Sequence, residues 1–209
     1  MSVFLNFGEK IEGFEYKVIN EREARASAGI MFLLGFMSLF SVYVERTIFW
    51  AELYSITIIL EFIIRVLFNP SYAPYMMIGG FFVKNQQPEW VEAKQKHFAW
   101  FLALGLGAMM TYYIVFDLVS LVRMVICWIC LALMFIESAF GICLGCVLYK
   151  KMNWKTYNCP GGICDLPPPP YKKKKIAFIL LFLTLFVGIY GILTEIKAEE
   201  IPKTVVIIE

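Results

Sequence analysis

Six cysteines lie in the second half of the chain, in three pairs whose spacing is compatible with chemistry. The pairs are Cys127 and Cys130 in CWIC, Cys143 and Cys146 in CLGC, and Cys159 and Cys164 in CPGGIC. Two thiols three residues apart share one face of a helix, so one can attack a disulfide while the other resolves the mixed disulfide. The spacing predicts a thiol-redox or sulfur-transfer pair, for which Cys143 and Cys146 are the candidates.

The last two pairs also allow a metal-binding interpretation. Cys143, Cys146, Cys159 and Cys164 follow the pattern C-x2-C-x12-C-x4-C. This pattern is close to the spacing of four-cysteine zinc sites. Four thiolates also hold iron–sulfur clusters, and the spacing alone does not separate zinc from iron.

Inert packing is the third interpretation, because free cysteine is among the most buried residue types and behaves as a small hydrophobe. We favour it for the CWIC pair, which falls in the middle of an apolar run. Around the CLGC pair the expected electrostatic effects oppose one another. Burial raises the pKa of a thiol, and the C-terminal end of a helix disfavours a thiolate. Lys150 and Lys151, one turn further on, stabilise the anion.

Glu137 lies inside the same apolar run, with no basic residue within four positions. Because charged side chains inside a membrane face a partner or a wet cavity, we expect its partner to come from another helix or from water. Glu137 is then either a proton carrier or a structural glutamate. It belongs to a stripe spaced by threes and fours that we expect to face the bundle. The stripe is Arg123, Cys127, Cys130, Met134, Glu137 and Gly141.

Cys143 does not share that stripe, since it lies about 240° around the helix from Glu137. One site using both residues requires a kink near Gly141. Gly141 and Gly145 form a G-x-x-x-G step, which favours the close approach of another helix.

Two other features have structural interpretations. Glu61 and Arg65 are four residues apart, which predicts a self-contained ion pair on one helix. His97, the only histidine, starts an apolar run, where we expect it to act as an interfacial anchor. No phosphate-binding loop and no serine–histidine–acid set is evident, so nucleotide hydrolysis and triad-type hydrolysis have no support.

The composition predicts a membrane protein. Hydrophobic residues make up 60% of the 209 residues and the mean hydropathy is +0.69, whereas soluble domains are about 45–50% apolar. The formal net charge of +2 is too small to indicate a nucleic-acid partner. The first residues lack the basic-then-apolar layout of a cleaved signal peptide, so we expect the first span to remain.

The apolar runs predict an all-α, polytopic membrane helix bundle of about five transmembrane helices. The expected spans are 26–44, 47–68, 98–116, 118–149 and 176–194. The fourth is longer than one crossing needs. We favour a single tilted helix there over a span that turns back at the two glycines. The Pro- and Gly-broken segment 69–97 is expected to be interfacial or re-entrant.

The distribution of basic residues predicts a cytoplasmic N-terminus. With this orientation, only three basic residues outside the spans face the other side: Arg46, Lys197 and Lys203. Residues 1–150 then form a membrane domain with four spans. They are followed by a cytoplasmic loop rich in Cys, Pro and Lys at 151–175, the fifth span and a short tail at 195–209.

Four segments resemble an uncharacterised family of bacterial multi-pass membrane proteins catalogued as domain-of-unknown-function 4395. They are VINEREARASAGI (18–30), EFIIRVLFNP (61–70), PEWVEAKQKHFAW (88–100) and ESAFGICLGCVLY (137–149). The resemblance covers about residues 18–150 and implies a protein of the bacterial cytoplasmic membrane. It also implies that the Cys143–Cys146 pair is a family feature, often found beside sulfur and thiol-redox proteins. It brings no established activity or cofactor.

Three functions are compatible with these observations. The first is a thiol-based redox or sulfur-transfer component of the bacterial inner membrane, working with a cytosolic thiol or sulfur-carrier protein. The second is a metal-stabilised module with a four-cysteine zinc or iron site. The third is a noncatalytic subunit of a membrane complex. We favour the first, with Cys143, Cys146 and Glu137 as its reacting residues, and leave open whether the protein is an enzyme.

Overall fold

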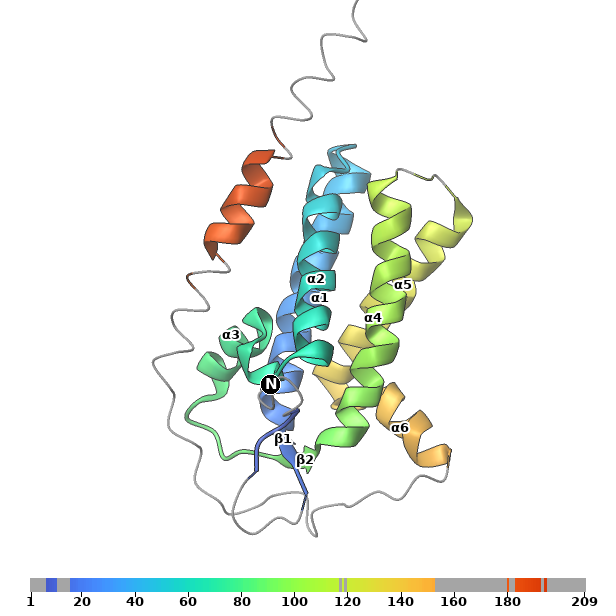
Figure 1. The fold of residues 1–209 in the computed structure, drawn as a ribbon. Coiled ribbons are helices and arrows are strands. Elements are labelled where there is room, and N and C mark those ends of the chain that lie inside the picture. The colour runs from blue at the N-terminus through green and yellow to red at the C-terminus, as the bar shows by residue number, and fades with distance from the viewer. Residues whose placement is uncertain are drawn as a thin grey trace, which may run out of the picture.

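The structure is a computed structural model that describes residues 7–10, 16–116, 118, 120–152, 180, 183–192 and 194. This part of the chain is helical, with one pair of three-residue strands (Figure 1). The strands are β1 (Val18–Asn20) and β2 (Trp90–Glu92). The helices are α1 (Glu21–Val44), α2 (Phe49–Leu67), the 3-10 turn η1 (Pro70–Tyr72), α3 (Pro74–Val83), α4 (Ala93–Val115), α5 (Leu121–Phe140) and α6 (Leu144–Lys151). The predicted all-α class is confirmed.

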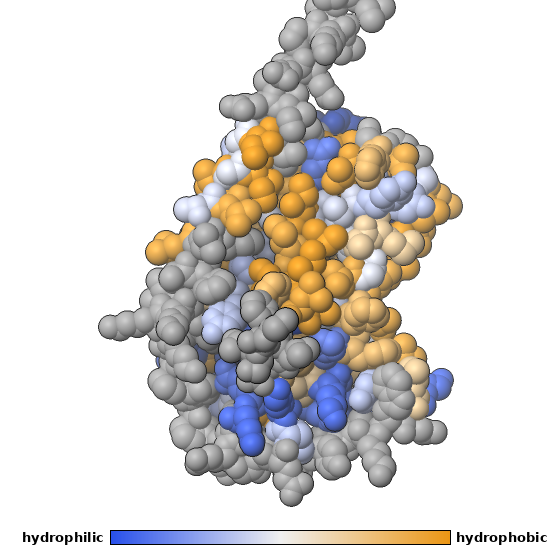
Figure 2. Space-filling model, viewed as in Figure 1, coloured by the Kyte–Doolittle hydropathy of each residue, from blue (hydrophilic) through white to orange (hydrophobic). Residues whose placement is uncertain are grey.

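Among the described residues, three helices are long and apolar enough to cross a membrane: α1, α4 and α5. They contain 24, 23 and 20 residues, and about 20 residues are needed to cross the hydrocarbon. Many of their outward side chains are large, apolar and exposed, such as Phe40, Phe101 and Trp128. Figure 2 shows an apolar surface above a group of strongly hydrophilic residues in the lower part of the molecule. These helices identify a membrane protein.

Helix α2 has 19 residues and is as apolar as its neighbours, but it carries Glu52, Glu61 and Arg65. Of the predicted fifth span, 176–194, the structure describes residues 180, 183–192 and 194, and Leu183–Ile192 forms an apolar helix. The predicted loop at 151–175 falls almost entirely outside the described residues, and the predicted tail at 195–209 falls wholly outside them.

The predicted ion pair on α2 is confirmed, and it also positions a neighbouring helix. Arg65 Nη2 lies 2.7 Å from Glu61 Oε1 and donates a second hydrogen bond of 3.0 Å to Ser27 Oγ on α1. The Glu61 carboxylate accepts from the backbone N–H groups of Tyr75 and Met76 at 3.0 and 3.3 Å. Since those N–H groups belong to the first turn of α3, a negative charge there is stabilising. The predicted interfacial or re-entrant segment therefore contains a short helix fixed to α2.

The two strands bring the polar ends of α1 and α4 together. Strands β1 and β2 are antiparallel, with Val18 opposite Glu92 and Asn20 opposite Trp90. Because α1 begins directly after β1 and α4 begins directly after β2, the first turns of both helices lie at one end of the bundle (Figure 1).

The single tilted helix expected over 118–149 is wrong. Helix α5 ends at Phe140, Gly141 has a left-handed backbone with φ of 66°, and α6 begins at Leu144. Glycine adopts this conformation without a steric penalty from a Cβ atom, so it ends helices efficiently. The sequence is continuously apolar through the turn, which hid the break. The structure agrees instead with the alternative of a turn at the first glycine.

The proposed G-x-x-x-G step is also wrong, because its two glycines belong to different elements. Gly145 nevertheless allows a close approach: a Cβ atom there would lie 2.6 Å from Ala99 Cβ on α4. Gly141 lies against the guanidinium of Arg25, where a Cβ atom would come within 2.5 Å of Arg25 Cζ. Helix α6 is thereby held against the polar end of α4.

We expect Gly141→Ala to destabilise the protein by about 1–3 kcal/mol, because an L side chain is strained in this backbone region. The added Cβ would also displace Arg25. Thermal unfolding of the detergent-solubilised protein measures the effect. Gly105→Ala is the matched control, since a Cβ at Gly105 meets nothing within 4 Å and a helical Gly→Ala change is favourable by up to about 1 kcal/mol. Equal unfolding temperatures for the two variants would contradict the assignment.

Candidate functional site

A buried lysine joins three helices at the polar end of the bundle. Lys96 Nζ lies 2.9 Å from Glu21 Oε1 on α1 and 2.7 Å from Glu137 Oε1 on α5. The Lys96 side chain is only 2% exposed. A buried charge is costly unless it is paired and hydrogen-bonded, and here one ammonium faces two carboxylates. The expectation that the partner of Glu137 comes from another helix is confirmed.

A second cation extends this network toward the surface. Arg25 Nε lies 3.5 Å from Glu21 Oε1, and Arg25 Nη2 lies 3.3 Å from Glu89 Oε1. Glu21 therefore contacts both cations. The network fixes the first turns of α1 and α4 relative to the last turn of α5.

Cys143 occupies the N-cap position of α6, with extended backbone angles of −86° and 103°. Cys146 is three residues further on, in the first helical turn. The expectation that the pair lies at a helix C-terminus is therefore wrong, and the electrostatic consequence is reversed. The N-terminal end of a helix carries a partial positive charge and free N–H groups, which stabilise a thiolate.

The two thiols, which lie outside the three membrane-crossing helices, differ in acidity. A hydrogen bond from the Cys146 thiol lowers the pKa of Cys143; burial opposes this effect and the nearby Lys96 ammonium adds to it. The same hydrogen bond, together with burial, raises the pKa of Cys146. Both thiols are free. This asymmetry favours Cys143 as the attacking thiol and Cys146 as the resolving thiol.

The thiol pair lines a hollow at the polar end of the bundle. Its volume is about 460 Å³, and its wall includes Lys96, Glu21 and Arg25 with both cysteines. The break at Gly141 is what brings the CLGC pair beside Glu137, so the kink that a shared site requires is present. Cys143, Cys146 and Glu137, three candidates from the sequence, belong to one site around Lys96.

The remaining candidates lie elsewhere. Cys127 and Cys130 are half-buried free thiols on α5 that pack against an apolar cluster around Met110 and Ile114. Cys159 and Cys164 lie outside the described residues. Within the described residues, no three His, Cys, Asp or Glu side chains are placed to hold a metal ion.

His97, expected to be an interfacial anchor, lies at the polar end of the bundle. Its Nε2 is 3.2 Å from the Val66 carbonyl oxygen, and its ring meets Phe7 edge to face.

Two central residues, Lys96 and Glu21, were not predicted as site residues. The expected third span begins at residue 98, which leaves Lys96 in a loop, whereas α4 begins at Ala93. Two features of the sequence could have indicated Lys96. Glu137 has no basic residue near it in the sequence, so it required a cation from elsewhere, and few lysines lie close to the end of a span.

These features define the class: a helical membrane protein with a thiol pair at the N-terminus of a short helix, beside a buried lysine. The chain belongs to the family described as domain of unknown function (DUF4395), whose model matches residues 19–153. This confirms the family resemblance, and the match includes the whole site. Neither the curated proteins nor the solved structures give a significant match.

The acidity difference predicts a difference in alkylation. Cys143 is expected to react with iodoacetamide faster than Cys146 in the folded protein, with a pH profile displaced below that of an ordinary thiol. Replacing the hydrogen-bond donor in Cys146→Ala raises the pKa of Cys143, so its rate at neutral pH should fall several-fold. Mass spectrometry of the alkylated peptides measures each site. Cys127→Ala is the control and should leave the profile unchanged; modification of Cys143 only after denaturation would contradict the prediction.

Proposed function

We propose that this protein is a thiol-based redox or sulfur-transfer component of the bacterial inner membrane, acting through Cys143 and Cys146. The observation that supports this most directly is the position of Cys143 at the start of α6, in one hollow with Cys146 and the buried Lys96. Both thiols line the same hollow, which a partner's sulfur can enter. A cysteine that only fills space in the core requires neither a helix N-terminus nor a neighbouring lysine.

The proposed exchange begins with the Cys143 thiolate attacking a disulfide of a cytosolic thiol protein or sulfur carrier. One partner sulfur leaves as a thiolate and a mixed disulfide forms. Cys146 then loses its proton and attacks Cys143 Sγ, which releases the second partner thiolate and closes the Cys143–Cys146 disulfide. Two electrons pass to the partner, whose thiolates take up two protons. Glu137, paired with Lys96, is the proposed acceptor for the Cys146 proton.

We further propose a multi-pass topology with five spans and a cytoplasmic N-terminus. The support is the concentration of basic residues at the end of the bundle that holds the thiols, as expected for a cytoplasmic face. Lys84, Lys94, Lys150 and Lys151 belong to this end, with Arg22 and Arg25. The cytosol keeps thiols reduced, which suits an exchanging pair.

The topology predicts opposite labelling of two exposed positions in a cysteine-free background. Lys84→Cys, at the end of α3, should react with a membrane-impermeant maleimide only after the cells are permeabilised. Arg46→Cys, between α1 and α2, should react in intact cells. Reversed labelling would place the thiol pair on the oxidising side of the membrane and would contradict the proposed topology.

The exchange predicts that oxidised glutathione is trapped by one variant only. Reduced Cys146→Ser protein should accumulate a glutathione adduct on Cys143, because no resolving thiol remains. The wild type should pass through this adduct to the intramolecular disulfide, and Cys143→Ser should accumulate little adduct on Cys146. Intact-mass spectrometry distinguishes the three results, with Cys127→Ser as a control that behaves as wild type.

Equal adduct formation in Cys143→Ser and Cys146→Ser would refute these assigned roles. Stoichiometric zinc or iron in the purified protein, lost in Cys159→Ser, would instead favour the four-cysteine module.

A further inference from the structure

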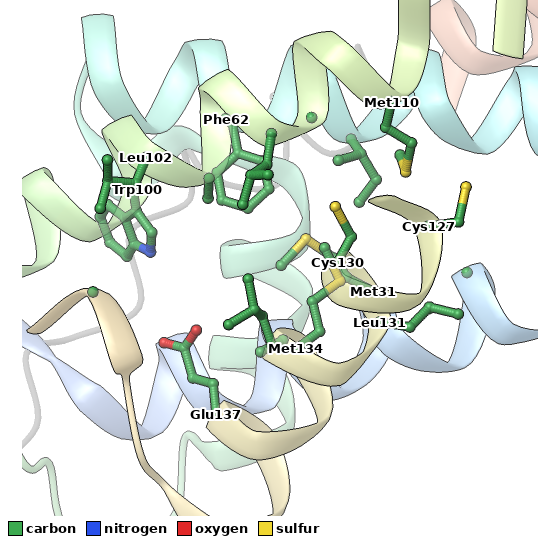
Figure 3. A pocket seen from close by; sticks show the side chains of 18 of the residues that line it. Met31, Phe62, Trp100, Leu102, Met110, Cys127, Cys130, Leu131, Met134 and Glu137 are labelled. Atoms are coloured by element: carbon green, nitrogen blue, oxygen red, sulfur yellow. The ribbon is translucent and has the colours of Figure 1, made fainter. Parts of the chain in front are cut away.

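A second cavity lies inside the bundle, on the membrane side of the thiol pair. Its volume is about 260 Å³, and α1, α2, α4, α5 and α6 all contribute to its wall. Figure 3 shows this wall, which is mostly apolar and combines aliphatic side chains with several aromatic and thioether ones. Phe62, Trp100, Met31, Met110 and Met134 are among them.

Several polar or reactive groups interrupt this apolar wall. Besides Glu137 and Cys143, they include Arg65, Tyr54, Ser38 and the two thiols of α5, Cys127 and Cys130. The carboxylate of Glu137 points into the cavity on the side of Trp100 (Figure 3). Cys143 also lines the cavity, together with Gly145 of α6. A cavity that only accommodates a lipid chain needs neither a thiol nor an acid.

Cys143 lines both cavities. The polar hollow lies on one side of it, and the apolar cavity lies on the other. The Lys96–Glu137 ion pair of 2.7 Å joins the two, with Lys96 in the wall of the hollow and Glu137 in the wall of the cavity. Cys143 is therefore shared by the polar hollow and the apolar cavity.

The apolar cavity has an apolar way in. Leu102 on α4 and Leu144 and Leu148 on α6 line it and are also exposed on the outer surface. These three leucines give the cavity an apolar edge at the outer surface, between α4 and α6.

We propose that the cavity binds the ring of a lipid-soluble quinone, which takes the electrons of the Cys143–Cys146 dithiol. This deepens the proposed function by naming its membrane-side reactant. The thiol–disulfide exchange described above, run in the reverse direction, lets a reduced thiol partner restore the dithiol that the quinone oxidises. An apolar cavity of about 150 Å³ accommodates benzene, so one of about 260 Å³ has room for a substituted ring. The ring is flat and apolar, which suits Phe62 and Trp100, and its oxygens accept hydrogen bonds or protons.

The electron and proton balance closes within the site. The Cys143 thiolate adds to a ring carbon of the quinone. Cys146, after losing its proton, attacks Cys143 Sγ, so that the S–S bond forms and the S–C bond breaks. The electron pair of the broken bond stays on the ring, which becomes a hydroquinone by taking up two protons. Glu137 delivers protons to the ring, and Lys96 connects it to the polar hollow.

The test uses the full-length protein, reduced, freed of excess reductant and held anaerobically in lipid nanodiscs. The probe is a short-chain benzoquinone. We expect one quinone to be reduced for each Cys143–Cys146 disulfide formed, followed by quinone absorbance and intact mass. Gly107→Leu fills the cavity, because Gly107 lines it and a Cβ there meets only Ile58 Cγ2, at 3.8 Å. Overpacking should lower the rate of quinone reduction by about tenfold or more.

Gly105→Leu is the matched control: it lies on the same helix, is exposed and does not line the cavity. It should reduce the quinone at the wild-type rate. Because Gly107→Leu can also fail by misfolding, binding is measured separately in Cys143→Ser, in which no reaction occurs. The quinone should quench tryptophan fluorescence in this variant, and the quenching should fall when Trp100→Phe is added.

The outcomes separate the two proposals. Exchange with glutathione without quinone reduction would overturn the quinone site and leave the proposed function intact. Absence of both reactions would overturn both. Equal rates of quinone reduction in Gly107→Leu and Gly105→Leu, or a phospholipid that the quinone does not displace from the cavity, would also overturn the inference.

Discussion

The contact of Lys96 with Glu21 and Glu137 is the constraint on which the site depends. An ammonium ion removed from water requires close partners, and its two carboxylates come from different helices. Distances of 2.9 and 2.7 Å leave little freedom in how α1, α4 and α5 meet. The turn at Gly141 follows directly after the helix that carries Glu137, so the same contact determines where α6 begins.

The position of the thiols relative to a helix end decides their chemistry. At the end of a long helix, CLGC would experience the partial negative charge of the carbonyl groups. At the start of α6, the same residues experience the opposite sign. The difference arises from one backbone conformation at Gly141, not from a different set of side chains.

Much of the fold follows from the sequence. The membrane character comes from the long apolar runs, and the Glu61–Arg65 pair follows from its four-residue spacing. The need for a distant partner of Glu137 was also evident. The identity of that partner, Lys96, was not evident, because a lysine close to the end of a span cannot be distinguished in the sequence from one in a basic loop. The break after Phe140 was hidden by uninterrupted apolar residues, and cysteine is not a usual helix-capping residue, so nothing marked the start of α6.

The short strand pair has a consequence for how the protein responds to its lipid surroundings. Backbone hydrogen bonds between β1 and β2 hold the starts of α1 and α4 together independently of the bilayer. Membranes of different thickness force helices to tilt or shift. With one end fastened in this way, such adjustments fall on the opposite ends of α1 and α4. The geometry at the fastened end, where the sulfur atoms lie, therefore changes little when the length of the lipid chains varies.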